Sequence, residues 1–125
     1  MSWEKIMAGT ELASRHCEAC EQGTPPLDEE RATLLQGDID PAWERDGTRM
    51  LRRRLRFGDF KDAFGFATRI ALVAEEEGHH PDMEIGWGKV VVSLTTHSSG
   101  GLTPNDFIMA AKVDRLAAGT GLKEG

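Results

Sequence analysis

The clearest hydrophobic pattern in the chain lies between residues 60 and 77, where apolar residues recur every three or four positions. That spacing predicts an amphipathic helix with one buried stripe. The residues expected on the stripe are Phe60, Ala63, Phe64, Ala67, Ile70, Ala71 and Ala74. Gly78 follows where a helix commonly ends in a left-handed residue, so the helix is expected to stop there and to leave His79 and His80 in a loop.

A second pattern is the alternation of apolar and more polar residues over positions 89–97. Val90, Val92 and Leu94 occupy every second position, which predicts a strand with one buried face. His97 falls on the more polar side and is expected at the end of this strand.

An earlier strand pair is expected around Asp46-Gly47, a dipeptide typical of two-residue hairpin turns. The flanking residues have strand character, which predicts strands near 42–45 and 48–57. The side chains expected on the inward face of this hairpin are Leu51, Leu55 and Phe57.

Two further helices are indicated by their start signals. A double proline followed by three acidic residues predicts a helix over about residues 28–36. Thr103 as N-cap, Pro104 in the first helical position and Asp106 three residues after the cap predict another helix that runs to about residue 118.

Together these elements predict an α+β domain in which antiparallel strands are covered on one face by helices. No internal repeat or low-complexity tract interrupts it. We expect an N-terminal extension over residues 1–23, one compact domain over 24–120 and a C-terminal tail over 121–125.

Composition narrows the class of protein. The chain has 125 residues, 39% of them hydrophobic, which suits a single globular domain. It contains no apolar run approaching the roughly 18 residues of a membrane span. The N-terminus lacks the features of a secretory signal, so a cytoplasmic location is expected. A net charge of −6 argues against general nucleic-acid binding.

One cationic stretch, RMLRRRLR, carries Arg49, Arg52, Arg53, Arg54 and Arg56. Such a run is a possible nucleic-acid contact. Strand alternation, however, places Arg52, Arg54 and Arg56 on one face, where some of the 21 acidic residues can neutralise them. A solvated or interface role is therefore preferred to nucleic-acid binding.

The short motif HCEAC places His16 beside a C-x-x-C pair, Cys17 and Cys20. Such a pair can be a redox dithiol or half of a zinc site. No second pair of ligands follows at zinc-site spacing, so packing or incidental thiols are expected instead.

Two segments supply three of the four histidines: the loop after the long helix gives His79 and His80, and the end of the alternating strand gives His97. Imidazole both gives and takes protons near neutral pH, so their convergence indicates general acid–base chemistry. An open metal site and histidines that merely satisfy a turn are the two alternatives that the residues leave open.

The stretch EEEGHHPDMEIGWGKVVVSLTTHSSGGLTPND closely resembles the signature of the pterin-4a-carbinolamine dehydratases. The matching elements are Glu75, His79-His80-Pro81, Trp87, His97 and Asp106. LRFGDFKDAFGFATRIALVAEEEG resembles the family's helix and its approach, and CEACEQGTPPL resembles an extension common in bacterial members. The resemblance covers about residues 15–118.

The resemblance implies four antiparallel strands with three helices on one face, in a homodimer or homotetramer. It implies an enzyme with no metal and no organic cofactor, whose substrate is a 4a-hydroxytetrahydropterin released by aromatic amino-acid hydroxylases. Elimination of water would give a quinonoid dihydropterin, which a reductase can recycle.

The resemblance also implies roles for single residues. His79 and His97 would carry out the proton transfers, with the order of acid and base left open, and His80 would contact the substrate. The other residues expected to bind or frame the substrate are Glu75, Pro81, Thr95, Thr96 and Asp106. Trp87 would lie in the core or an interface, or would stack on the pterin.

The sequence departs from the family at Met83, where an aromatic residue is common, and in the EIGW that follows it. The strand in this region is therefore expected to pair or pack differently. An alternative of the same fold is a binding protein, either a dimerisation cofactor of a transcription factor or a carboxylase assembly factor. A pterin-linked role outside amino-acid hydroxylation also stays open. Because a binding protein has no need of the histidines, their presence favours the enzyme.

Overall fold

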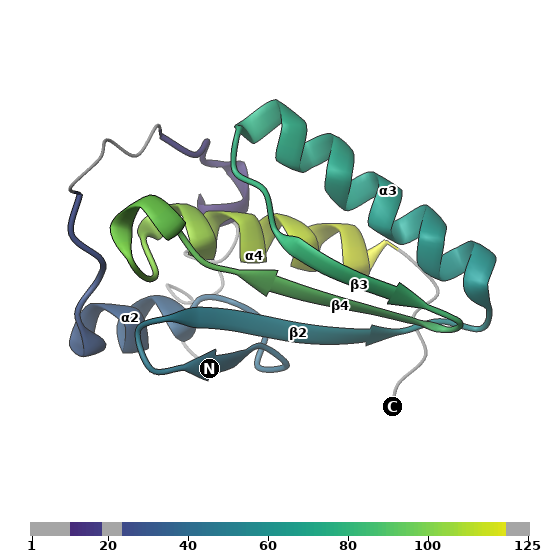
Figure 1. The fold of residues 1–125 in the computed structure, drawn as a ribbon, viewed down its shortest axis with the longest axis horizontal. Coiled ribbons are helices and arrows are strands. Elements are labelled where there is room, and N and C mark those ends of the chain that lie inside the picture. Colours follow the sequence, from purple (N-terminus) through teal and green to yellow (C-terminus); the bar gives the residue numbers. More distant parts are fainter. Residues whose placement is uncertain (1–10, 19–23, 120–125) are drawn as a thin grey trace.

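The computed structural model describes residues 11–18 and 24–119. Its strands form one antiparallel sheet in the order β1-β2-β4-β3. The strands are β1 (Glu44–Asp46), β2 (Met50–Arg56), β3 (Asp82–Gly86) and β4 (Lys89–Leu94). The main helices are α2 (Glu29–Gln36), α3 (Phe60–Glu77) and α4 (Pro104–Ala118). Helices α3 and α4 pack on the sheet and α2 packs on α4, as Figure 1 shows, which confirms the α+β class.

The two central strands follow the expected alternation. Leu51 and Leu55 of β2 and Val90, Val92 and Leu94 of β4 are almost completely buried against the helices. The single buried face is thereby as the residue pattern predicted, and the four strands are as the family resemblance implied.

The first hairpin differs from the prediction. The turn consists of residues 47–49, three residues long, because Asp46 pairs with Met50. Gly47 adopts a φ of 55°, and the Arg49 N–H donates to the carbonyl of Asp46 over 2.9 Å. A left-handed glycine followed by this closing bond makes a wider turn than the two-residue one expected.

The buried stripe of α3 is narrower than predicted. Ala63, Ala67, Ile70 and Ala74 are buried as expected, and Phe66 joins them, packed 5.2 Å from the Phe57 ring. The expected members Phe60, Phe64 and Ala71 are exposed. Phe60 and Phe64, 47% and 53% exposed, stack on each other away from the sheet. Neighbouring sheet strands cover only one side of α3, so part of the wide apolar arc faces outward.

The arginine run divides between the two faces of β2. Arg52, Arg54 and Arg56 lie on the exposed face, as predicted, whereas Arg53 points inward and is 9% exposed. Arg53 forms an ion pair with Asp114 of α4, and Asp114 also accepts the indole N–H of Trp43 over 2.8 Å. This buried pair therefore ties the sheet to α4.

Residues 11–18, which were expected to belong to an N-terminal extension, pack against helices α3 and α4. Residues 11–14 form a helical turn, and Leu12 and Ala13 are each only 4% exposed. Lys112 of α4 donates to the carbonyl of Ala13 over 2.8 Å. The expectation about Cys17 and Cys20 is only half covered by the structure. Cys17 is described, and Cys20 lies outside the described residues. Within the described ranges, no helix is both long and apolar enough to cross a membrane.

Candidate active site

The end of α3 presents the first two histidines. Gly78 adopts a φ of 68°, and its N–H donates to the carbonyl of Ala74 over 2.9 Å. The left-handed cap predicted from the sequence is confirmed. His79 and His80 follow it directly and lie between α3 and β3.

The third histidine is placed by the loop after β4. This strand ends at Leu94, so His97 lies beyond the strand, at the start of a 3₁₀ turn, and not at its end as predicted. Thr96 and Gly101 form an isolated bridge that closes the loop. Gly101 permits the close approach of this loop to the turn at 47–49, because a Cβ there would lie 2.6 Å from the carbonyl oxygen of Thr48.

The two segments meet around one cleft of about 470 Å³. Its lining consists of Glu18, Glu77, Gly78, His79, His80, Thr95, Thr96, His97, Ser98 and Asn105. The structure thus brings together the three histidines that the sequence singled out. The cleft exposes polar and apolar surface in about equal measure, and a volume of this size suits a small heterocyclic ligand.

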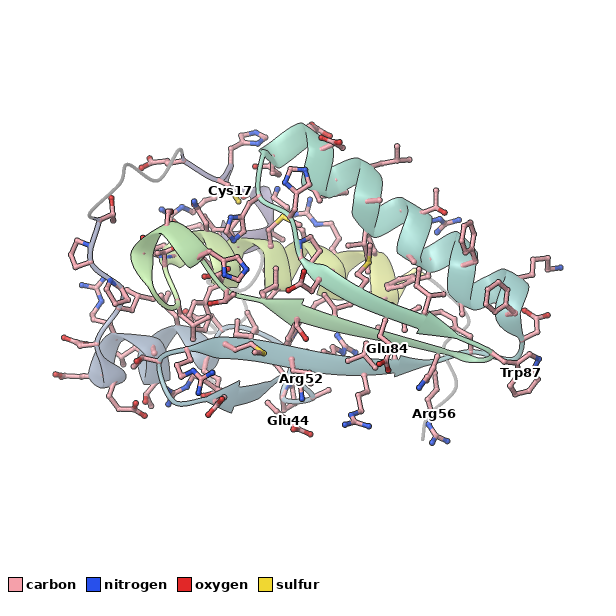
Figure 2. All side chains as sticks on the ribbon, viewed as in Figure 1. Cys17, Glu44, Arg52, Arg56, Glu84 and Trp87 are labelled. Atoms are coloured by element: carbon pink, nitrogen blue, oxygen red, sulfur yellow. The ribbon has the colours of Figure 1, made fainter. Side chains whose placement is uncertain are left out.

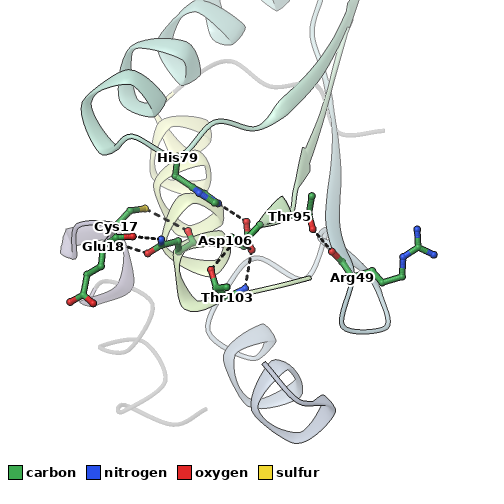
Figure 3. Close-up of polar contacts among 9 residues, drawn as sticks. Cys17, Glu18, Arg49, His79, Thr95, Thr103 and Asp106 are labelled. Atoms are coloured by element: carbon green, nitrogen blue, oxygen red, sulfur yellow. Dashed lines mark hydrogen bonds and ion pairs between the residues drawn. The ribbon is translucent and has the colours of Figure 1, made fainter. Parts of the chain in front are cut away.

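His79 is held by Asp106, as Figure 3 shows. Its Nε2 lies 2.6 Å from Oδ1 of Asp106, and the two side chains are 12% and 0% exposed. The other carboxylate oxygen accepts the N–H of Thr103 over 3.0 Å and the hydroxyl of Thr96 over 2.8 Å. The predicted capping box at the start of α4 is present, and its acidic member also reaches His79.

His80 has a looser partner. Its Nε2 lies 3.3 Å from Oε2 of Glu75, and these side chains are 58% and 78% exposed. Of the described residues that were expected to bind or frame the substrate, Glu75, Pro81 and Asp106 lie outside the lining of the cleft. Glu75 contacts the lining residue His80, and Asp106 contacts the lining residues His79 and Thr96.

The two threonines of the cleft use their hydroxyls within the protein. Thr95 donates to the carbonyl of Arg49 over 2.5 Å, and Thr96, which is buried, donates to Asp106. Both residues still line the cleft. In this arrangement they shape its wall and hold neighbouring groups, while their hydroxyl protons point to protein acceptors.

Trp87 lies far from the cleft, at the tip of the hairpin between β3 and β4, as Figure 2 shows. The histidines flank the other, open end of this hairpin. The Trp87 side chain is 74% exposed. Neither a core position nor stacking on a ligand in the cleft of its own chain fits this placement. The strand that departs from the family, β3, pairs with β4 from Asp82 to Gly86, and Met83 is half-buried against the core.

The sequence did not reveal one wall of the cleft. Glu18, Glu77 and Asn105 line it together with the histidines. Glu77 is one of three consecutive glutamates, and only the fold distinguishes it as the buried one, with its side chain 3% exposed. Asn105 lies one residue before Asp106, but its contact with residue 18 spans 87 positions, which no local pattern signals.

The chain is similar in sequence to one known protein family and to named bacterial proteins. The family model described as pterin 4 alpha carbinolamine dehydratase matches residues 24–116. A Methylococcus capsulatus protein provisionally named a pterin-4-alpha-carbinolamine dehydratase is 46% identical over 113 residues, which cover 90% of this chain and 98% of that protein. A Rubrobacter xylanophilus protein with the same provisional name is 44% identical over 107 residues, 86% of this chain and 99% of the relative.

Two solved structures share the fold. The crystal structure of a transcriptional coactivator/pterin dehydratase from Brucella melitensis superposes with a TM-score of 0.68 at 36% identity and covers 74% of this chain and 98% of that one. A pterin dehydratase-like protein identified as a RuBisCO assembly factor in the alpha-carboxysome superposes with a TM-score of 0.54 at 28% identity and covers 63% and 93%.

Proposed function

The chain belongs to the pterin 4 alpha carbinolamine dehydratase family, and from that premise we propose that it removes water from a 4a-hydroxytetrahydropterin by histidine acid–base catalysis. In this elimination the C4a–O bond breaks, the proton on N5 leaves, and a C4a=N5 double bond forms. The products are a quinonoid dihydropterin and water. The step needs a base for the N5 proton and an acid for the departing hydroxyl, and it needs no redox partner.

His79 is the proposed base. A carboxylate only accepts hydrogen bonds here, so the proton between His79 and Asp106 sits on Nε2 of the neutral imidazole. That leaves Nδ1 with a lone pair to take a proton. Once the ring becomes positive, the buried Asp106 carboxylate stabilises it at 2.6 Å. We thus assign Asp106 to the orientation of His79 and not to direct contact with the pterin.

His97 is the proposed acid and His80 the proposed substrate-positioning residue. His97 lies on an exposed turn and lines the same cleft as His79, so it can exchange protons with solvent between turnovers. His80, whose exposed ring lies near Glu75, would contact the hydroxyl or the ring edge of the pterin. Pro81 would restrict the backbone just after these histidines. Thr95 and Thr96 would frame the bound ring.

The observation that carries this proposal is the meeting of three imidazoles in one cleft, one of them fixed by a fully buried carboxylate. The test is the dehydration of a 4a-hydroxytetrahydropterin by the purified full chain after exhaustive chelation. We expect turnover to persist and His97→Ala to lower kcat about 10²–10⁴-fold with the fold intact. Loss of turnover on chelation, restored by added zinc, would instead favour the metal chemistry.

A second candidate is a binding or assembly protein of the same fold. It is supported by the similarity to the solved RuBisCO assembly factor and by the exposed aromatic residues Phe60, Phe64 and Trp87. A folded chain with no dehydratase activity above that of His79→Ala would favour this candidate.

The biological setting is also proposed. A dehydratase of this substrate would serve the recycling of the pterin used by aromatic amino-acid hydroxylases, in the cytoplasm. The exposed side chains of Phe60, Phe64 and Trp87 support a homodimer or homotetramer. Light scattering of the full chain tests the oligomeric state, and growth on phenylalanine of a strain lacking the protein tests the role in recycling.

A further inference from the structure

The buried carboxylate of Glu77, in the last turn of α3, receives the N-terminal segment. It accepts the N–H of Cys17 over 2.7 Å, and its other oxygen lies 2.8 Å from Nδ1 of His16. Lys112 of α4 lies 3.7 Å from the same oxygen. The helix dipole makes a negative charge at a helix C-terminus unfavourable. These three contacts offset that effect and hold the Glu77 carboxylate in one position.

Asn105, in the first turn of α4, holds the next part of the same segment. Its Oδ1 accepts the N–H of Glu18 over 3.0 Å, and its Nδ2 donates to the carbonyl of Glu18 over 2.6 Å. The thiol of Cys17 lies 3.7 Å from the Asn105 carbonyl. Figure 3 shows these contacts beside the His79–Asp106 pair. Asn105 is 6% exposed, so both amide groups are satisfied away from bulk solvent.

The segment therefore joins the same two helix ends as the proposed catalytic pair. It contacts α3 two residues before His79 and α4 one residue before Asp106. We propose, resting on the proposed function, that residues 16–18 form a brace that positions His79 against Asp106, with Glu77 and Asn105 as its two positioning residues. The brace fixes the distance between the helix ends, and that distance sets the alignment of the His79 ring.

Charge supports the brace at neutral pH. Burial by itself raises the pKa of Glu77, but the Cys17 N–H, the His16 ring and Lys112 together outweigh it and hold the pKa below its ordinary value. A carboxyl whose pKa is depressed in the folded state stabilises that state above the unfolded pKa and ceases to do so as the pH falls through the folded one. The brace is thus intact at neutral pH, and it weakens only as the pH falls below the ordinary range of a glutamate carboxyl.

The test compares Glu77→Gln with Glu76→Gln, which makes the same change one residue away at an exposed position. We expect Glu77→Gln to lower kcat about tenfold with KM changed less than about twofold, because misalignment of a catalytic group acts on the transition state. Glu76→Gln should match the unchanged protein. In the Asp106→Asn background the same Glu77→Gln change should cost less than about twofold, since the pair it aligns is already broken.

A readout without turnover separates this inference from the proposed function. Imidazole ¹⁵N spectra at pH 8 should show His79 protonated on Nε2 in the unchanged protein and in Glu76→Gln, and a mixture of tautomers in Glu77→Gln and in Asn105→Ala. If His79 changes tautomer while kcat does not, the brace stands and the catalytic role of His79 falls. Unchanged His79 signals in Asn105→Ala, or equal kcat losses with and without Asp106, would overturn the brace. Asn105→Ala leaves Glu77 intact and decides the matter if Glu77→Gln does not fold.

Discussion

His79 and His80 are neighbours in sequence, and each lies beside a carboxylate, but the two pairs are built differently. His79 lies 2.6 Å from Asp106, and the two side chains are 12% and 0% exposed. His80 lies 3.3 Å from Glu75, and these are 58% and 78% exposed. Asp106 has two further protein donors, Thr96 and Thr103, while Glu75 projects from the last part of α3 into solvent.

Both pairs consist of an imidazole and a carboxylate, but their different exposure to solvent suits them to different roles. Away from water, a carboxylate fixes the tautomer and direction of an imidazole. In water, the same pair is screened and the ring stays free to turn. The buried pair thus suits proton transfer, and the exposed pair suits adaptable contact with a ligand.

The largest expected effect comes from removing the buried ring. His79→Ala should lower kcat about 10²–10⁴-fold, the usual range for the loss of a general base. Thermal melts check that the variant folds, and steady-state kinetics measures the loss. Near-normal kcat in a folded His79→Ala protein would sink the proposed mechanism.

A smaller loss is expected when only the partner of the buried ring is changed. Asp106→Asn keeps the size of the side chain but removes its charge, and a charge-assisted bond of about 1.5–3 kcal/mol corresponds to roughly 10- to 100-fold in kcat. Single-turnover kinetics isolates the chemical step. Asp106→Ala would also remove the Asp106 half of the capping box of α4, so the asparagine variant separates catalysis from stability better. If Asp106→Asn lowers kcat as much as His79→Ala does, the His79 ring makes no catalytic contribution without the Asp106 carboxylate.

Removing the exposed ring should act mainly on binding. His80→Ala is expected to raise KM about tenfold, as for the loss of one good ligand contact, and to change kcat less than about threefold. The comparison between the two histidines fails if His80→Ala loses as much kcat as His79→Ala does.

The smallest effect is expected at the exposed carboxylate. Glu75→Gln should change kcat and KM less than about threefold, because an exposed ion pair contributes little and is screened by salt. Repeating the assay in low and high salt checks this explanation. A loss comparable to that of Asp106→Asn, independent of salt, would contradict the contrast between the pairs.

Much of the fold followed from local patterns. The cap at Gly78, the capping box at Asp106 and the alternation of β4 depend on residues a few positions apart, and all three are present. The three-residue turn at 47–49 and the outward-facing Phe60 and Phe64 were missed, because strand register and helix coverage depend on distant partners.

The site was predictable in part for the same reason. The sequence placed His79 and His80 after a helix end and His97 at the end of a strand, and the fold brings both segments to one cleft. It could not show that Asp106 is buried behind His79, or that Glu77 and Asn105 receive the N-terminal segment. Those contacts join residues 27, 60 and 87 positions apart, and the residue types alone permit many other partners.

The hairpin between β3 and β4 also limits how the sequence can vary. Its register runs from Asp82↔Ser93 to Gly86↔Lys89, and Gly88 at the tip has a φ of 70°. One residue inserted into either strand would shift His97 by about 3.3 Å relative to His79 and turn the side chains that follow to the other face of the sheet. An insertion or deletion near Trp87, far from the cleft, would thus disturb the site more than most substitutions along the exposed face of β3. The hairpin is expected to tolerate changes of residue and not changes of length.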